Sequence, residues 1–470
     1  MLKVAALHDR SGRYYLADLA ADPGWASAGC RSAGRWTGAG ATGLGLAGPV
    51  DAGAFVAILE GREVTSGRPL AGRRGTVSAF DLTFAAPKSV SVLMAFGTPR
   101  VVREVERAHA DAVEAALGYV GRRAAGVRRG DGETRRIEPA GGLVAATFTH
   151  HVSRALDPHL HSHVVVANLG HGPDSRWSAL DGRGLFAHAR TAGRLYDAEL
   201  RHQLSSRLGL GWTTRASGSI EVAGVSPEIL GALSSRRAEI DEHLHARGGP
   251  GGPAARRVAW AVTRDAKADP LARGELVRAW RERAASVGGD AHDLAIATPG
   301  LRRGPFLDEH RFAAELVNGR DAGATRRDVV GAWAVAAGPD VGAADVERCA
   351  DLLAEWGGSV GVAEVPAQRS GFVPTAYIQS VLGPRPASPH LLAVWQEAAS
   401  AVERFRSRWG VEDRRRALGA EVPGRDAPGM GAVRLADHLS VTRRLADARR
   451  ELGSDRTKGL GPPERGLGLG

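Results

Sequence analysis

The stretch FTHHVSRALDPHLHSHVVVANL, residues 148–169, constrains the fold of this chain more than any other segment. It holds two apolar runs on either side of the polar sequence SRALDPH, which is typical of two strands joined by a turn. Side chains alternate along a strand, so His161 and His163 are expected on one face of the second strand. In an antiparallel hairpin, His150 of the first strand lies beside them. The segment therefore predicts antiparallel pairing with three histidines on one face.

Three imidazoles from two adjacent strands can hold a metal ion and leave coordination positions open, which is typical of catalytic sites. We therefore take His150, His161 and His163 as candidate metal ligands. His159 shares their face, but residues four apart on a strand are separated by about 13 Å at about 3.3 Å per residue. One ion does not easily bind both His159 and His163, so His150 is the better third ligand. His151 points to the opposite face, and we interpret it as a solvated or core histidine.

The 470 residues include 62 lysines and arginines against 52 aspartates and glutamates, which gives a formal net charge of +10. A basic balance favours a polyanionic partner such as nucleic acid, although the arginine-rich composition of a GC-rich genome accounts for it equally well. Two cysteines, Cys30 and Cys349, are too few for a disulfide framework or a cysteine-based zinc site. The sequence Gly-Lys does not occur, which excludes a Walker A loop. We find no signal peptide and no apolar run of about 20 residues, so we expect a soluble, cytoplasmic protein without a membrane partner.

The pattern of the first 170 residues predicts short apolar strands with helices between them. The pattern of residues 185–290 predicts mostly helices. The elements predicted before residue 170 are a strand over 79–85, a helix opened by Pro87, a helix over 101–123 and strands over 143–150 and 160–169. The glycine- and proline-rich sequence RGGPGGP, residues 247–253, predicts a hinge in the helical block. We place a domain boundary near residues 300–305.

The region after this boundary is predicted to be mostly helical. The segment RRDVVGAWAV, residues 326–335, fits either a DNA-reading helix or a helix packed in a core. Another helix is predicted over 389–409, with Ser388 as its N-cap and an apolar stripe that indicates a core or a partner-helix contact. Residues 453–470 have the composition of a disordered tail.

Two adjacent tyrosines, Tyr14 and Tyr15, occur near the N-terminus of a chain that has only five tyrosines. A tyrosine hydroxyl, with a pKa near 10, attacks phosphate well only when a base or a cation withdraws its proton. Asp81, in the apolar sequence FDLTF, can orient a histidine ligand or accept that proton, because a carboxylate buried alone is unfavourable. By itself, a tyrosine pair also fits a buried core pair.

Five motifs, in the order in which they occur here, resemble those of the MobF family of conjugative relaxases, which are HUH-type DNA strand transferases. They are GRYYL, GRWTGAGATGLGLAG at 34–48, FDLTFAAPKSVS at 80–91, SRALDPHLHSH at 153–163 and RLYDAEL at 194–200. The resemblance covers about residues 1–290 and implies an α+β fold, a two-layer domain with a central antiparallel sheet under helices. It also implies nicking of one plasmid DNA strand at an origin of transfer, which leaves a 5′-phosphotyrosine and a free 3′-hydroxyl.

The resemblance also implies roles for individual residues. Tyr14 becomes the nucleophile and Tyr15 its neighbour, the three histidines bind a divalent ion, Mg²⁺ or Mn²⁺, and Asp81 is the activating carboxylate. The implied partners are single-stranded DNA at an origin of transfer, accessory relaxosome proteins and a coupling protein.

Two basic residues are candidate DNA contacts. Lys88 falls in the first turn of the helix after the FDLTF strand, where free N–H groups and the helix dipole favour phosphate. Arg154 falls in the turn between the ligand strands, where it contacts DNA or pairs with Asp157.

The sequence departs from the MobF pattern at two points, and each limits the activities that the resemblance implies. The stretch ADLAADPGWASAG, where many members carry a second tyrosine pair, has Trp25 and no tyrosine, so a second transfer at such a pair is not expected. Members of the family commonly continue into a helicase, which we do not expect within these 470 residues. We divide the chain into a relaxase domain (1–300), a helical accessory region (301–452) and the tail (453–470). A rolling-circle replication initiator with the same chemistry and a non-catalytic DNA-binding relic are the alternative functions.

Overall fold

The computed structural model describes residues 2–8, 34–71, 76–130, 136–215, 219–246, 272–288, 325–355 and 376–409, with isolated positions at 249, 255, 411 and between 441 and 452. Tyr14, Tyr15 and Trp25, most of the predicted hinge and the tail therefore lie outside the described residues. The chain divides into two compact units, Met1–Gly304 with Pro339–Val346, and Pro305–Gly338 with Glu347–Gly470.

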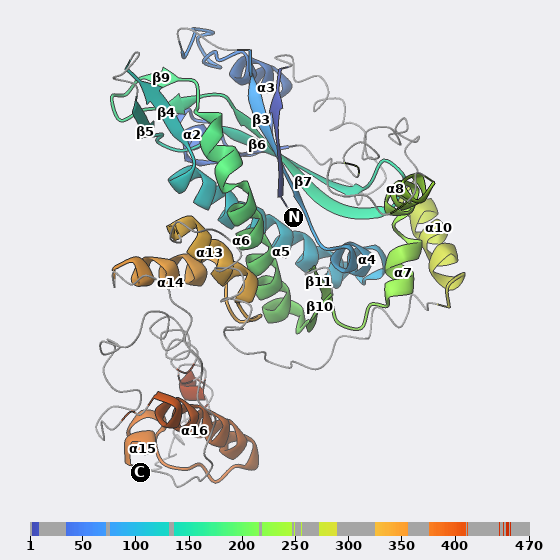
Figure 1. The fold of residues 1–470 in the computed structure, drawn as a ribbon, viewed down its shortest axis with the longest axis vertical. Coiled ribbons are helices and arrows are strands. Elements are labelled where there is room, and N and C mark those ends of the chain that lie inside the picture. Colours follow the sequence, from blue (N-terminus) through green and yellow to red (C-terminus); the bar gives the residue numbers. More distant parts are fainter. Residues whose placement is uncertain are drawn as a thin grey trace, which may run out of the picture. The chain divides into compact units, whose positions relative to one another are not determined.

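A five-stranded antiparallel sheet forms the centre of the first unit (Figure 1). Its strands, in the order β1-β3-β7-β6-β2, are β1 Leu2–Leu7, β3 Ala79–Ala85, β7 Pro158–Ala167, β6 Ala145–Val152 and β2 Arg35–Thr37. Every neighbouring pair is antiparallel. The predicted central antiparallel sheet is confirmed, and so is the strand predicted over 79–85.

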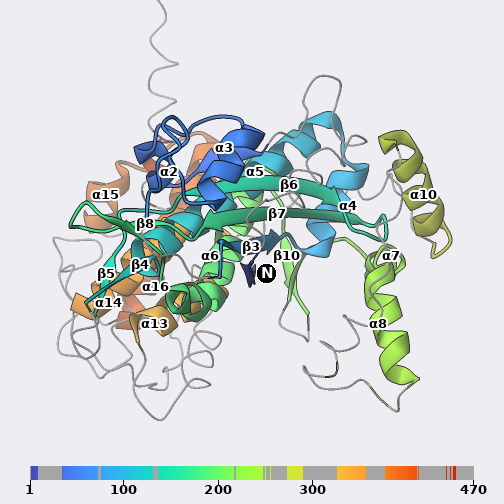
Figure 2. The same ribbon diagram turned by 90° about the horizontal axis from the view of Figure 1, so that it is seen from above.

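Strands β6 and β7 form the predicted hairpin (Figure 2). Both strands lie two residues closer to the turn than predicted, because β6 continues to Val152 and β7 begins at Pro158. A register irregularity between His150 and Val152 lets the ladder continue past the histidines. The turn itself contains Leu156, which has a positive φ of 56°.

Two long helices, α5 (Pro99–Arg123) and α6 (Gly182–Leu208), pack against each other and against the sheet (Figure 1). Thr98 caps α5 by accepting the Val101 N–H, and a proline follows at the first helical position. Helix α6 ends at Gly209, whose φ of 69° suits a residue without a Cβ. Helix α5 confirms the helix predicted over 101–123, and its apolar side chains are buried in the core.

The remaining elements of the first unit are short. They are α2 (Ala39–Gly43), α3 (Ala52–Leu59), α4 (Lys88–Phe96), β4 (Gly126–Arg129), β5 (Arg136–Pro139), β8 (Gly170–His171), β9 (Trp177–Ser178), β10 (Trp212–Thr214), β11 (Ile220–Val222), α7 (Pro227–Ala232), α8 (Ser235–His245) and α10 (Arg273–Ala285). The described part of residues 185–290 is mostly helical, as predicted, and the exception is the antiparallel hairpin of β10 and β11, which was not predicted. Strands of three residues are too short for the alternation of apolar and polar side chains to be visible in the sequence.

Helix α10 holds the turn between β6 and β7 (Figure 2). The indole N–H of Trp280 donates to the carbonyl oxygen of Leu156 at 2.7 Å. Arg283 Nη2 donates to Asp157 Oδ1 at 2.8 Å, and this buried carboxylate also accepts from the hydroxyl of Ser235 at 3.0 Å. The strand that carries His161 and His163 therefore starts from a turn fixed by a helix more than 100 residues later. No local sequence pattern indicates this role of Trp280 and Arg283.

We expect Arg283→Met to lower the free energy of unfolding by about 2 to 3 kcal/mol, because it leaves Asp157 buried without its cationic partner. Arg281→Met on the same helix is the matched control, since Arg281 is exposed, and it should change stability by less than about 0.5 kcal/mol. Chemical denaturation measures both variants. Equal effects would mean that the ion pair does not stabilise the turn.

The described part of the second unit and the residues leading into it are helical, which confirms a mostly helical C-terminal region. The helices are α13 (Arg326–Ala336), α14 (Ala343–Glu355), α15 (Ala376–Leu382) and α16 (Pro389–Trp409). Helix α13 buries Val330 and Trp333, which favours the packed-core interpretation of this segment over DNA reading. Trp395, Val402 and Phe405 of α16 belong to one buried cluster, so the predicted stripe is core. Among the described residues, no helix is both long and apolar enough to span a bilayer.

Candidate metal centre and active site

The structure brings His150, His161 and His163 together on one face of the β6–β7 hairpin. His150 is the cross-strand partner of His161. The three ring centroids are 5.2 to 5.5 Å apart, and one ligand atom of each histidine lies within 4.8 Å of the other two. Among the described residues, this is the one cluster of histidine, cysteine or acidic side chains with metal-binding geometry. Three convergent imidazole nitrogens fit a divalent metal ion and leave positions for other ligands.

Asp81 fixes the orientation of His163. The Nδ1 atom of His163 lies 2.8 Å from Asp81 Oδ2 and 3.0 Å from Asp81 Oδ1, and the hydroxyl of Thr83 is 3.3 Å from the same nitrogen. The carboxylate accepts from Nδ1–H, so Nε2 carries the lone pair that can bind a metal ion. Asp81 is only 8% exposed, which makes this hydrogen bond the compensation for its burial.

A backbone carbonyl orients His161 in the same way. The Nδ1 atom of His161 lies 2.9 Å from the carbonyl oxygen of His159. A carbonyl only accepts, so Nδ1 carries the proton and Nε2 is again the free ligand atom. Burial, reinforced by the neighbouring His159 and His150, holds the pKa of His161 well below its usual range. The neutral imidazole is the form that binds metal.

The other two histidines of the stretch do not join the ligand cluster. His159 stacks on His161, with ring centroids 4.5 Å apart, and burial lowers the pKa of His159 to about 4. His151 points to the opposite face of the hairpin, where its Nε2 lies 3.0 Å from Glu106 Oε1 of α5. Strand alternation therefore describes all five histidines of this region correctly.

The surroundings of Lys88 differ from the sequence interpretation. Glu221 of β11 already occupies the first turn of α4, because its Oε2 accepts from the Ser89 N–H at 3.0 Å and from the Ser89 hydroxyl at 2.6 Å. Lys88 Nζ donates to the carbonyl oxygen of Pro158 at 2.7 Å. Burial lowers the pKa of Lys88 to about 8, against the opposing effect of Asp157. Glu221 could not be predicted for this position, since no local pattern links residues 132 positions apart.

Arg154 lies in the turn between β6 and β7, as predicted. Asp157, its alternative partner, pairs with Arg283 instead.

Two tyrosines of the first unit are inaccessible to DNA. Tyr119 and Tyr196 are 1% and 0% exposed, and each hydroxyl is bound to a buried or half-buried histidine. Neither can act as a nucleophile in this fold. The predicted nucleophile Tyr14 and its neighbour Tyr15 lie outside the described residues.

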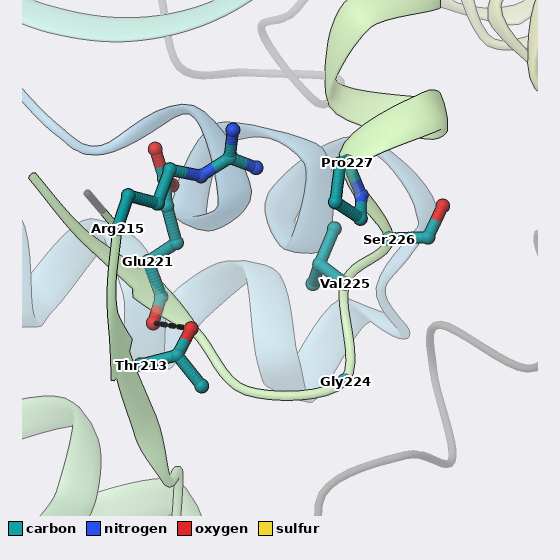
Figure 3. A pocket seen from close by; sticks show the side chains of 7 residues that line it. All are labelled: Thr213, Arg215, Glu221, Gly224, Val225, Ser226 and Pro227. Atoms are coloured by element: carbon teal, nitrogen blue, oxygen red, sulfur yellow. Dashed lines mark hydrogen bonds between the residues drawn. The ribbon is translucent and has the colours of Figure 1, made fainter. Parts of the chain in front are cut away.

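A pocket of about 610 Å³ lies elsewhere, between the β10–β11 hairpin and the start of α7 (Figure 3). Its lining residues are Thr213, Arg215, Glu221, Gly224, Val225, Ser226 and Pro227. None of the three ligand histidines lines this pocket, so the pocket is separate from the histidine cluster.

Residues 8–287 match the family model described as TrwC relaxase. The chain belongs to the TrwC relaxase family. The match includes strands β2, β3, β6 and β7, the three histidines and helix α10. It confirms the resemblance to conjugative relaxases.

Relatives of the TrwC relaxase family agree in sequence and in fold. Multifunctional conjugation protein TraI of Escherichia coli is 35% identical over 224 residues, which cover 44% of this chain and 12% of TraI, and TraI of strain K12 is 34% identical over the same length. The match thus spans about one eighth of the length of these relatives. Solved structures of the conjugative relaxase TrwC with OriT DNA, one metal-free and one copper-bound, are 30% and 32% identical, with TM-scores of 0.54 and 0.55. Each covers 62% of this chain and 100% of the TrwC chain.

The hydrogen bond from His163 to Asp81 gives a direct prediction. We expect Asp81→Asn to weaken Mn²⁺ binding about 10- to 100-fold, because the amide cannot replace the charged acceptor that orients His163. Titration calorimetry with Mn²⁺ measures this, with Thr83→Val as the milder comparison. Unchanged affinity in Asp81→Asn would show that the carboxylate acts on the proton of the nucleophile rather than on the ligand.

Proposed function

We propose that this protein nicks and rejoins single-stranded DNA at a plasmid origin of transfer, through a 5′-phosphotyrosine. The observation that carries the proposal is the three-histidine cluster with both β7 imidazoles oriented, in the part of the chain that matches TrwC relaxase. The description of the TrwC structures as complexes with OriT DNA supports the choice of a transfer origin over a replication origin. The assembled ligand set supports an active enzyme over a relic.

The proposed reaction is a balanced exchange of phosphodiester bonds. The hydroxyl oxygen of Tyr14 bonds to phosphorus as the bond between phosphorus and the 3′ oxygen breaks, and the tyrosine proton is replaced by one on the departing 3′-hydroxyl. Rejoining reverses these steps without ATP, since the phosphotyrosine conserves the bond energy. We assign to Asp81 the orientation of His163 rather than acceptance of the tyrosine proton, because both of its oxygens face His163 Nδ1.

A divalent ion held by His150, His161 and His163 would withdraw charge from the phosphate oxygens. Of the two ions expected from the resemblance, we propose Mn²⁺, because Mg²⁺ prefers oxygen ligands and this donor set is all imidazole.

The proposed function also includes DNA contacts, partner proteins and a division of the chain into domains. We propose Lys88 and Arg154 as phosphate contacts of the bound strand, and relaxosome proteins and a coupling protein as partners in the cytoplasm. We also propose a relaxase domain over 1–300, an accessory helical region over 301–452 and a tail over 453–470.

The assignment of Tyr14 as the nucleophile predicts one covalent attachment per chain. After Tyr14 has captured a 5′ end, the chain should rejoin it to an incoming 3′-hydroxyl but should not cleave a second strand. Tyr196 is buried, and if the segment that holds Tyr15 is helical, its side chain points about 100° away from that of Tyr14. The purified adduct, challenged with a differently labelled oligonucleotide, should give joined product and no doubly labelled protein. Doubly labelled protein would contradict this assignment.

A further inference from the structure

A chain of hydrogen bonds runs behind the metal centre, from the helices into the sheet. The Tyr196 hydroxyl of α6 lies 2.7 Å from His109 Nδ1 of α5, and His109 Nε2 lies 2.8 Å from the hydroxyl of Ser162 on β7. The hydroxyl of Ser162 is 2.8 Å from that of Thr149 on β6. Tyr196, His109 and Ser162 are at most 1% exposed. None of these four side chains takes part in the reaction proposed above.

All donors of this hydrogen-bond chain find acceptors in only one direction of donation. Burial lowers the pKa of His109 to about 3, so its imidazole is neutral, with one donor and one acceptor. Within the described residues, the hydroxyl of Tyr196 has His109 as its hydrogen-bond partner. Tyr196 therefore donates to Nδ1, Nε2–H donates to Ser162, and Ser162 donates to Thr149. In the reverse direction the buried Tyr196 O–H would lack an acceptor, at a cost of about 1 to 3 kcal/mol.

The end of this chain lies directly behind the metal ligands. Ser162 separates His161 from His163 in the sequence and points to the opposite face of β7. Thr149 precedes His150 on β6, and the pair Thr149–Ser162 is the cross-strand neighbour of the pair His150–His161. The hydroxyl contact thus joins the two strands one step from the point where they supply ligands.

The ladder of β6 and β7 is regular from Ala145 to His150 but irregular between His150 and the turn, so a side-chain contact beside the ligand pair adds to the hold on its register. A register irregularity separates His150 from Val152, between the ligand pair and the turn. The fixed turn therefore does not transmit its register to the ligand pair through a regular ladder. A one-residue slip would carry His150 to the other face of the sheet and remove it from the site.

We propose that Tyr196, His109, Ser162 and Thr149 are positioning residues for the three-histidine metal centre. They hold β6 and β7 from the helix side so that the imidazoles converge on the other side. They touch neither DNA nor the ion. The inference rests on the proposed function, because metal binding is the property that these residues position.

Tyr119 offers a matched control for a role in stability alone. Its hydroxyl lies 2.8 Å from His188 Nδ1, between the same two helices, and Tyr119 is 1% exposed. Tyr119→Phe and Tyr196→Phe therefore each remove one buried hydroxyl between α5 and α6. Of these two hydroxyls, that of Tyr196 is connected to the ligand strands through His109 and Ser162.

The test uses the full chain and its Tyr196→Phe, Ser162→Ala, Thr149→Val and Tyr119→Phe variants. Mn²⁺ affinity is measured by calorimetry well below the unfolding temperature, and the visible spectrum at saturating Co²⁺ reports the ligand geometry. We expect similar losses of stability in the two tyrosine variants. We expect about tenfold weaker Mn²⁺ binding and an altered Co²⁺ spectrum in Tyr196→Phe and Ser162→Ala, with Tyr119→Phe unchanged in both.

Unchanged affinity and spectrum in Tyr196→Phe would overturn the inference, and so would an equal loss in Tyr119→Phe. Should Ser162→Ala not fold, Tyr196→Phe and Thr149→Val decide the question in its place. An unaltered chain that binds neither ion would instead contradict the metal site of the proposed function, and this inference with it.

Discussion

His161→Ala is expected to abolish divalent-ion binding and DNA cleavage together. His161 is a member of the ligand cluster, since its ring lies 5.2 Å from that of His150 and 5.3 Å from that of His163. Two remaining imidazoles on different strands do not retain a divalent ion at micromolar concentration, and we expect Mn²⁺ affinity to fall by at least about 100-fold. Calorimetric titration with Mn²⁺ and a cleavage assay on the same preparation measure the two effects.

His159→Ala is the matched control for this prediction. His159 lies on the same strand and the same face and stacks on His161, yet it is not part of the ligand cluster. The hydrogen bond from Nδ1 of His161 goes to the backbone carbonyl oxygen of His159, which the alanine variant keeps. Wild-type Mn²⁺ affinity in His161→Ala, or a loss in His159→Ala as large as that expected in His161→Ala, would contradict the site as assigned.

Tyr14→Phe is expected to abolish covalent attachment to DNA, with a loss of at least about 1,000-fold, while single-strand binding persists. The reaction needs a hydroxyl nucleophile, and the two tyrosines described in the first unit are buried. Tyr15→Phe is the control and should retain the adduct. A labelled oligonucleotide on a denaturing gel reports the adduct, and fluorescence anisotropy reports binding. The reverse result, an adduct in Tyr14→Phe but not in Tyr15→Phe, would move the nucleophile to Tyr15.

The metal cluster could be predicted because strand geometry is local. A period of two fixes which of five neighbouring histidines share a face, and the polar turn fixes which strand brings His150. Asp81 could also be singled out, because a carboxylate in an apolar strand requires a partner. The partner of His161, in contrast, is a backbone carbonyl, which carries no signature in the sequence.

The surroundings of the cluster could not be predicted, because they depend on contacts between distant segments. Glu221 reaches Ser89 from a hairpin whose strands are only three residues long, and Trp280 reaches Leu156 from a helix 124 residues away. The free helix start expected for a phosphate beside Lys88 was an inference from local structure alone. In the folded chain, a distant carboxylate takes that place.

The central claim is covalent DNA cleavage by Tyr14, and 3′-labelled oligonucleotides test it most directly. Single-stranded oligonucleotides tiled across the replicon that carries the gene would be incubated with the full chain and Mn²⁺, and then denatured. The 3′ label follows the fragment whose 5′ end becomes attached. Trypsin releases residues 14–31 as one peptide, and its fragmentation separates Tyr14 from Tyr15. We predict a denaturant-stable adduct on one tile, with the DNA on Tyr14. The absence of an adduct on every tile, with or without DNA cleavage, would contradict the account.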